Sequence, residues 1–220
     1  MPEIIKRVLT SIFLLILLYI LINNTVLLTI GLFFILIELF NEFNTIMKKI
    51  FYKKNEKFKL FFFLTLINFY LIIFGLTIFI TLESGNNLYK IYLLMIISIC
   101  VCTDIGGYCF GKLFKGKKLT KISPNKTYSG AIGSYIFALL IPTILFKDLI
   151  SIEIIFFVVF IVSTISQIGD LFISYFKRKA NLKDTGFILP GHGGLLDRFD
   201  GMIFAIPSGI LLLYILWLKI

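Results

Sequence analysis

The sequence predicts an all-α protein that crosses a membrane several times, and three observations support this prediction. Hydrophobic residues make up 59% of the 220 positions, and the mean hydropathy of +0.99 is well above that of water-soluble domains. Phe, Ile and Leu crowd into apolar runs close to the ~20 helical residues that span a ~30 Å hydrocarbon core. Basic residues gather between alternate runs. We therefore expect about seven transmembrane helices in a single membrane domain, 1–220.

Seven apolar runs define the expected helices. They cover 4–22, 25–40, 60–82, 88–103, 129–146, 153–176 and 202–219. The first run begins with a basic pair but has no small-residue cleavage site after it, so we interpret it as a retained helix rather than a signal peptide. We expect 1–100 to form mainly the helical scaffold, and 101–220 to supply the catalytic helices and loops.

The net charge of +10 is better explained by membrane topology than by binding of nucleic acid. Lys6 and Arg7 stand at the start of the first run, and the other basic residues lie between runs two and three, four and five, or six and seven, except Lys90, Lys147 and Lys219. The positive-inside rule then places the N-terminus and the three basic connections in the cytoplasm. We expect a multi-pass protein of a bacterial inner membrane, with membrane lipid and no nucleic acid among its partners.

Ionisable residues inside or at the ends of the runs gather on the cytoplasmic side of this topology. Asp104 closes the fourth run, Asp170 lies late in the sixth, and 183–200 connects the sixth run to the seventh. Charged groups are costly in hydrocarbon, so such positions mark a candidate active site. Glu38 and Glu42 are four residues apart at the end of the second run. They are either a helix-end hydrogen-bonding pair, which we favour, or a lesser part of the site.

One face of the sixth helix is expected to present a carboxylate, a hydroxyl and two cations. These groups stand at i, i+4, i+7 and i+8 and share a face if the helix continues out of the membrane. They are Asp170, Ser174, Lys177 and Arg178. A basic collar at a helix end would explain the two cations alone, but it would not explain Asp170.

The connection that follows reads KDTGFILPGHGGLLDRFDG. Gly193 and Gly194 allow backbone N–H groups to approach phosphate oxygens, and Asp197 and Asp200 supply hard oxygen ligands for Mg²⁺. The only histidine, His192, either hydrogen-bonds a phosphate or fixes the loop. Any one of these residues suits a plain turn, but the combination exceeds what a short connection needs.

The connection between runs four and five is basic and rich in hydroxyl groups, which suits a polyphosphate at the membrane surface. Its segment 111–118 is close to a Walker A motif. Lys118 stands where that motif needs Ser or Thr, and no strand precedes it, so we reject a P-loop. An anionic-lipid tether would need the lysines but not Asp104, Ser123 or Thr127.

These residues resemble the signature of the phosphatidate cytidylyltransferase family. That signature runs S-x-x-K-R-x4-K-D, then a small residue, then P-x-H-G-G-x-x-D-R-x-D. Its fixed positions are filled here by Ser174, Lys177, Arg178, Lys183, Asp184, Gly186, Pro190, His192, Gly193, Gly194, Asp197, Arg198 and Asp200. The upstream D-x-G-[AG]-Y-x-x-G and S-P-x-K-T stretches are matched by Asp104, Gly106, Gly107, Tyr108 and Gly111, and by Ser123, Pro124, Lys126 and Thr127.

The likeness covers the second half of the chain in detail and the first half only as apolar helices. Ser129 departs from the family, which usually has an acidic or amide residue there. The chain is also shorter than typical bacterial members, with fewer spans.

The resemblance implies transfer of CMP from CTP to phosphatidate, which gives CDP-diacylglycerol and pyrophosphate. It also implies Mg²⁺ held by Asp170 and Asp197, K⁺ as a second cation, and a homodimer. The expected catalytic residues are Lys177, Arg178, Lys183, Asp184, His192, Arg198 and Asp200. The expected substrate-binding residues are Asp104, Ser123, Lys126, Thr127, Ser174, Gly193 and Gly194.

Three other classes of protein compete with this interpretation. A CTP-dependent enzyme acting on an isoprenoid ether lipid, such as a CDP-archaeol synthase, would use the same chemistry, but the complete bacterial-type signature argues against it. CDP-alcohol phosphotransferases have a D-G-x-x-A-R stretch that does not occur here. A transporter would be expected to show two similar halves with matching interruptions, and none is visible.

Overall fold

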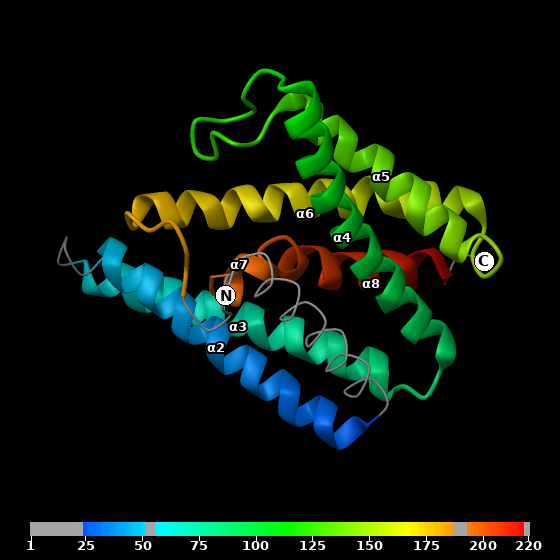
Figure 1. Ribbon diagram of the computed structural model, residues 1–220. Coiled ribbons are helices and arrows are strands. Elements are labelled where there is room, and N and C mark those ends of the chain that lie inside the picture. The colour runs from blue at the N-terminus through cyan, green and yellow to red at the C-terminus, as the bar shows by residue number, and fades with distance from the viewer. Residues whose placement is uncertain (1–23, 52–55, 187–192, 218–220) are drawn as a thin grey trace, which may run out of the picture. The chain divides into compact units, whose positions relative to one another are not determined.

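The computed structural model describes residues 24–51, 56–186 and 193–217, which form seven helices and no strand (Figure 1). Five of these helices are long and apolar enough to cross a membrane, and α8 (Met202–Trp217) is apolar but shorter. An all-α polytopic membrane protein is therefore confirmed. The helix expected over 4–22 lies outside the described residues.

The chain divides into two compact units. The first consists of the residues up to Gly85 together with Phe176–Phe199, and the second consists of Asn86–Tyr175 together with Asp200 onward. The expected single membrane domain stays a prediction. Much of the signature segment belongs to the same unit as the N-terminal helices, so residues of both halves of the chain contribute to the first unit.

In the first unit, α2 (Thr25–Phe51) packs against α3 (Lys57–Glu83), and Figure 1 draws the two side by side. A glycine makes the close approach possible. A Cβ added at Gly75 would lie 2.5 Å from Cδ1 of Leu36, so α3 presents bare backbone to α2 at this point. Small residues at such contacts let membrane helices approach closely, because lipid provides no hydrophobic drive for helix association.

The helix α2 continues to Phe51, although the apolar run predicted an end near residue 40. The extension is amphipathic, and its apolar side is buried. The buried side chains there are Phe43, Ile46, Met47 and Ile50. Tertiary packing therefore stabilises helix beyond the stretch that hydropathy alone identifies.

The second unit contains α4 (Asn87–Phe114), α5 (Tyr128–Phe146), most of α6 (Ile152–Lys179) and α8. Buried hydroxyl groups join its helices. The Thr103 hydroxyl of α4 donates to Ser163 Oγ of α6 at 3.0 Å, and the Ser134 hydroxyl of α5 donates to the Thr103 carbonyl at 2.7 Å. These bonds satisfy polar groups that would otherwise be unpaired in an apolar interior.

The expected end of the fourth helix near residue 103 is wrong, because α4 continues to Phe114. Asp104 and the glycines after it thus lie within a helix and not in a loop. The glycines serve packing: a Cβ at Gly106 would lie 2.8 Å from Cβ of Phe137, and one at Gly107 would lie 2.8 Å from Oγ of Ser134. Close contact with α5 outweighs the low helix propensity of glycine.

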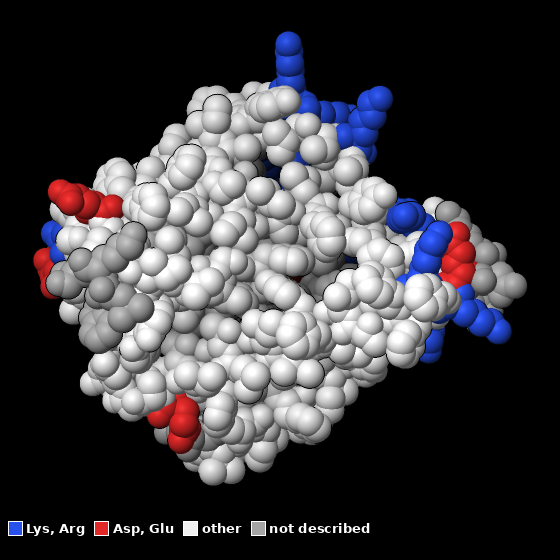
Figure 2. Space-filling model, turned by 180° about the vertical axis from the view of Figure 1, so that it is seen from behind, with Lys and Arg blue, Asp and Glu red and all other residues white. Residues whose placement is uncertain are grey.

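The described surface of each unit exposes large apolar side chains. In the first unit Phe33 and Phe34 are 64% and 67% exposed, and in the second unit Phe160 is 64% exposed. On the face drawn in Figure 2, most of the surface has no charged side chain, and Lys and Arg gather in a few clusters. Apolar surface of this extent requires lipid as its surroundings.

Candidate active site

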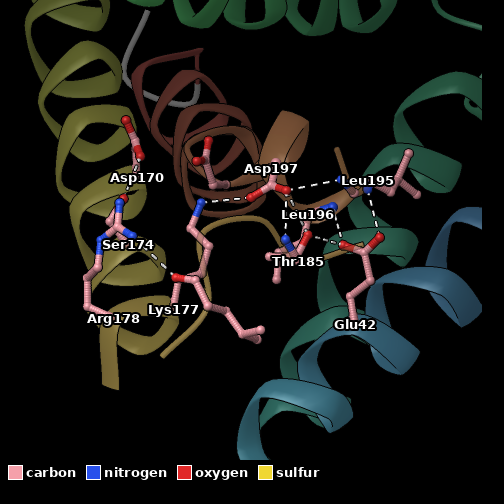
Figure 3. Close-up of polar contacts among 12 residues, drawn as sticks. Glu42, Asp170, Ser174, Lys177, Arg178, Thr185, Leu195, Leu196 and Asp197 are labelled. Carbon is pink, nitrogen blue, oxygen red and sulfur yellow. Dashed lines mark hydrogen bonds and ion pairs between the residues drawn. The ribbon is translucent and has the colours of Figure 1, made fainter. Parts of the chain in front are cut away.

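Asp197, in the short helix α7 (Leu196–Phe199), is held by a lysine and two backbone N–H groups (Figure 3). Its Oδ1 accepts a hydrogen bond from Lys177 Nζ at 2.7 Å. Its Oδ2 accepts from the N–H of Thr185 at 2.8 Å and from the N–H of Gly194 at 3.0 Å. The first unit thus brings Lys177, Gly194 and Asp197, all expected site residues, into contact.

The Asp197 carboxyl is ionised at neutral pH. Burial alone would raise its pKa, but the hydrogen bond and charge of Lys177 and the N–H groups of Thr185 and Gly194 outweigh burial, so the pKa lies below its ordinary value. The Lys177 and Asp197 side chains are only 11% and 9% exposed. A shielded, ionised carboxylate is a ligand type that Mg²⁺ favours.

Glu42 of α2 reaches the same segment from a distant part of the chain. Its Oε1 accepts from the N–H of Leu195 at 2.8 Å, and its Oε2 accepts from the N–H of Leu196 at 2.8 Å and from the Thr185 hydroxyl at 2.5 Å. The residue is 3% exposed. A helix-end pair with Glu38 was the interpretation we favoured, but this geometry supports the alternative, in which Glu42 belongs to the site.

Glycines of the signature segment make room for these two carboxylates. Gly193 has φ +81°, and a Cβ there would lie 2.9 Å from Oδ2 of Asp197. A Cβ at Gly194 would lie 2.5 Å from Oε2 of Glu42, and one at Gly186 would lie 2.7 Å from Oε1. In this arrangement the glycine backbone approaches protein carboxylates, and the Gly194 N–H donates to Asp197. Binding of substrate phosphate by Gly193 and Gly194 stays a prediction.

The second unit holds another carboxylate–lysine pair. Asp170 Oδ2 forms an ion pair with Lys126 Nζ. Asp170 Oδ1 accepts a hydrogen bond from the Ser174 hydroxyl at 3.3 Å (Figure 3). The Lys126 and Asp170 side chains are 28% and 23% exposed, so this pair is more open than the pair of Lys177 and Asp197. Three expected site residues come together here.

Backbone hydrogen bonds within the α4–α5 connection hold Lys126 in position. The carbonyl of Lys126 accepts from the N–H of Leu119 at 2.8 Å, and its N–H donates to the carbonyl of Ser123 at 3.1 Å. Thr127 caps α5, because its Oγ1 accepts from the N–H of Gly130 at 3.1 Å. Two expected substrate-binding residues, Ser123 and Thr127, thus have structural contacts here.

Ser129, which departs from the family pattern, also has a structural contact. Its Oγ accepts from the N–H of Gly116 at 3.3 Å and shares a hydrogen bond with Oγ1 of Thr127 at 3.0 Å. A short hydroxyl fits this place, since a Cβ at Gly116 would lie 2.8 Å from Oγ of Ser129. The serine at this position therefore helps to hold the two ends of the α4–α5 connection together.

The remaining expected site residues are divided between the units. Arg178 donates to the carbonyl of Leu182 at 3.3 Å, and Asp200 Oδ1 accepts from the N–H of Gly201 at 2.8 Å. His192 lies outside the described residues. In the first unit are Lys177, Arg178, Lys183, Asp184, Gly193, Gly194, Asp197 and Arg198, and in the second are Asp104, Ser123, Lys126, Thr127, Asp170, Ser174 and Asp200.

A common metal site at Asp170 and Asp197 stays a prediction, because the two residues belong to different units. Within the described ranges, no group of three His, Cys, Asp or Glu side chains could hold a metal ion. Among the expected site residues, each unit does provide a carboxylate that already accepts a positively charged donor. The sequence analysis gave Glu42 little weight as a site residue. The signal that could have identified it was a carboxylate at the end of an apolar run.

Fold and site together define a polytopic all-α membrane protein whose second half gathers carboxylates with lysines. Residues 2–216 match the sequence profile of the Cytidylyltransferase family. The match covers nearly the whole chain, and this protein therefore belongs to that family.

Several bacterial relatives named phosphatidate cytidylyltransferase are similar to this chain. The relative from Staphylococcus haemolyticus is 42% identical over 137 residues, which cover 60% of this chain and 52% of that protein. The Rickettsia prowazekii relative is 41% identical over 147 residues, covering 60% and 61%. The Staphylococcus epidermidis relative is 44% identical over 120 residues, covering 53% and 46%. The chain thus spans about half the length of the curated relatives it matches.

Proposed function

We propose that this protein is a phosphatidate cytidylyltransferase, which transfers CMP from CTP to phosphatidate and releases pyrophosphate. The main support is the complete signature, two of whose residues, Lys177 and Asp197, are in contact in a shielded position. The names of the relatives above point to the same activity. Phospholipid biosynthesis is the process that would use the product, CDP-diacylglycerol.

Transfer of CMP requires stabilisation of negative charge more than it requires a strong general base. A phosphate monoester has a second pKa near ~6, so phosphatidate is largely a dianion at neutral pH. One of its phosphate oxygens forms a bond to the α-phosphorus of CTP, while the bond from that phosphorus to the bridging oxygen of the β-phosphate breaks. Pyrophosphate leaves with the electron pair. Lysine and arginine side chains near these oxygens lower the barrier, and we assign this role to Lys177, Arg178, Lys183 and Arg198.

We also propose Mg²⁺ at Asp170 and Asp197, with K⁺ as a second cation. The two carboxylates fit this role chemically, because each accepts an ammonium group, from Lys126 or from Lys177. Carboxylate oxygens are ligands that Mg²⁺ prefers, and a bound Mg²⁺ would take the place of the ammonium group. When bound, the cations would supply positive charge beside the phosphates and the leaving pyrophosphate.

The proposed setting is a bacterial inner membrane, with the N-terminus and the catalytic loops on the cytoplasmic side. The distribution of lysines between alternate runs supports this orientation, and CTP is a cytoplasmic substrate. A homodimer belongs to the same proposal on the strength of the family resemblance.

The function is tested by release of pyrophosphate from purified protein in detergent with Mg²⁺ and K⁺. CTP and phosphatidate are offered together and separately. Release only with both, and CDP-diacylglycerol as the second product, is the expected result. Activity with an archaeol phosphate instead would favour the ether-lipid enzyme, and no release with either lipid would favour a transporter.

Two lysine variants test whether the signature contributes more to catalysis than the α4–α5 connection does. Lys118 lines a cavity of about 380 Å³ together with Lys121, and several neighbouring lysines can replace its charge, so Lys118→Ala is expected to lower kcat/KM by less than about threefold. Lys183→Ala removes a signature cation and is expected to lower kcat/KM by about tenfold or more. The rate of pyrophosphate release measures both. An equal loss in the two variants would show that we have misjudged the lysine-rich connection.

A further inference from the structure

We propose that Glu42 is a positioning residue for Asp197, acting through the backbone of 194–196 and the Thr185 hydroxyl; this inference rests on the proposed function. Glu42 lies outside the family signature and comes from α2, which the sequence assigned to the scaffold. All the residues that support the inference lie in the first unit.

The first step is the contact between Glu42 and the start of α7. One carboxylate oxygen accepts from the N–H of Leu195 and the other from the N–H of Leu196, each at 2.8 Å. A helix has no internal partner for its first N–H groups, so the carboxylate satisfies them. Asp197 is the next residue in the chain. The orientation of its backbone is therefore set by Glu42.

The second step is the Thr185 hydroxyl, which lies between the two carboxylates. It is 2.5 Å from Oε2 of Glu42 and 3.1 Å from Oδ2 of Asp197. A hydroxyl has one proton to donate, and the shorter contact indicates that Glu42 accepts it. The N–H of Thr185 donates to Asp197 at 2.8 Å. Thr185 is thus oriented by Glu42 and in turn holds Asp197.

The third step excludes a direct role for Glu42 in binding substrate or metal within this arrangement. Both carboxylate oxygens are already engaged, and the residue is 3% exposed. The space around the oxygens is also closed, since a Cβ at Gly186 would lie 2.7 Å from Oε1. The Glu42 oxygens accept only from neutral N–H and O–H groups of the described residues, whereas Oδ1 of Asp197 accepts from an ammonium group that a metal cation can replace, so Glu42 holds its donors in place and does not act as a ligand.

A test that does not depend on activity is amide hydrogen exchange in detergent micelles. Glu42→Gln keeps the size of the side chain, but its NH₂ group faces an N–H or O–H donor and cannot accept from it. We expect exchange at Leu195 or Leu196, whichever N–H meets the NH₂ group, to become about tenfold faster or more. Glu38→Gln, one turn away on the same helix, is the matched control and should leave exchange at both amides unchanged.

The same variants are then assayed for CMP transfer. Because Glu42 is expected to orient Asp197 and not to bind substrate, Glu42→Gln should lower kcat by about tenfold or more while KM for CTP and for phosphatidate changes by less than about threefold. Thr185→Ser keeps the hydroxyl and should retain most of kcat, whereas Thr185→Val, of similar size, should lose kcat as Glu42→Gln does. If Glu42→Gln does not insert into membranes, the comparison of Thr185→Ser with Thr185→Val still tests the positioning role.

Unchanged exchange at Leu195 and Leu196, or a Thr185→Val enzyme as active as Thr185→Ser, would overturn the positioning role. If the variants exchange as expected but the wild-type protein shows no CMP transfer, the proposed function is overturned. The contact between Glu42 and 195–196 would still be established. The two failures are therefore distinguishable.

Discussion

Asp197→Asn is expected to abolish CMP transfer, with a fall in turnover of about a thousandfold or more. Asparagine keeps the shape of the side chain but removes the charge, so the shielded Lys177 ammonium loses its partner and a proposed metal ligand is lost. Uncompensated buried charge is strongly unfavourable. Turnover is measured as pyrophosphate release from membranes that contain equal amounts of each variant.

The assay is best run at neutral pH, where Asp197 contributes fully to the stability of the folded protein. The pKa of Asp197 is lowered in the folded protein, so its contribution to stability is complete above the ordinary carboxyl value near 3.8 and is lost only as the pH falls through the lower folded value. Asp148→Asn removes the same charge from an exposed position and serves as the control. Turnover near that of the wild type in Asp197→Asn would remove Asp197 from the metal assignment.

Asp170→Asn is expected to have an effect of similar size, because it removes the other proposed metal ligand and the partner of Lys126. Ser174→Ala should lower turnover by less than about tenfold, since the Ser174 contact with Asp170 is long, at 3.3 Å. Both variants are compared across a titration of Mg²⁺, with K⁺ held constant. Chelation of Mg²⁺ from the wild-type enzyme should reproduce the loss seen in Asp170→Asn.

If Ser174→Ala and Asp170→Asn lose turnover to the same extent, the hydroxyl and not the carboxylate is the important group on this face of α6. If excess Mg²⁺ restores Asp170→Asn fully, the residue lowers the Mg²⁺ requirement but is not needed for catalysis.

The sequence alone was sufficient for the broad class of this protein. Apolar runs of membrane-spanning length determine helices, because in lipid every backbone polar group must be satisfied within its own segment. Five of the expected helices are present with apolar character and sufficient length, and α8 is present in shorter form. The signature residues were also recognisable from spacing, since a long gapped pattern needs no knowledge of distant contacts.

Helix ends were harder to predict from the sequence. The helix α2 reaches Phe51 and α4 reaches Phe114, both well beyond their apolar runs. In both cases the additional turns are helical because one face packs against other parts of the same unit. Hydropathy over a window measures the average of all faces, and it therefore misses a segment with only one buried face.

Only the tertiary structure decided the partners of the charged side chains. Lys126 pairs with Asp170, and Glu42 accepts three hydrogen bonds from residues more than a hundred positions away. Spacing along a helix predicts which residues share a face, but it does not predict which loop returns to meet that face. Such contacts depend on how separate segments fold together, so local pattern identifies the residue types of this site and three-dimensional packing assigns their roles.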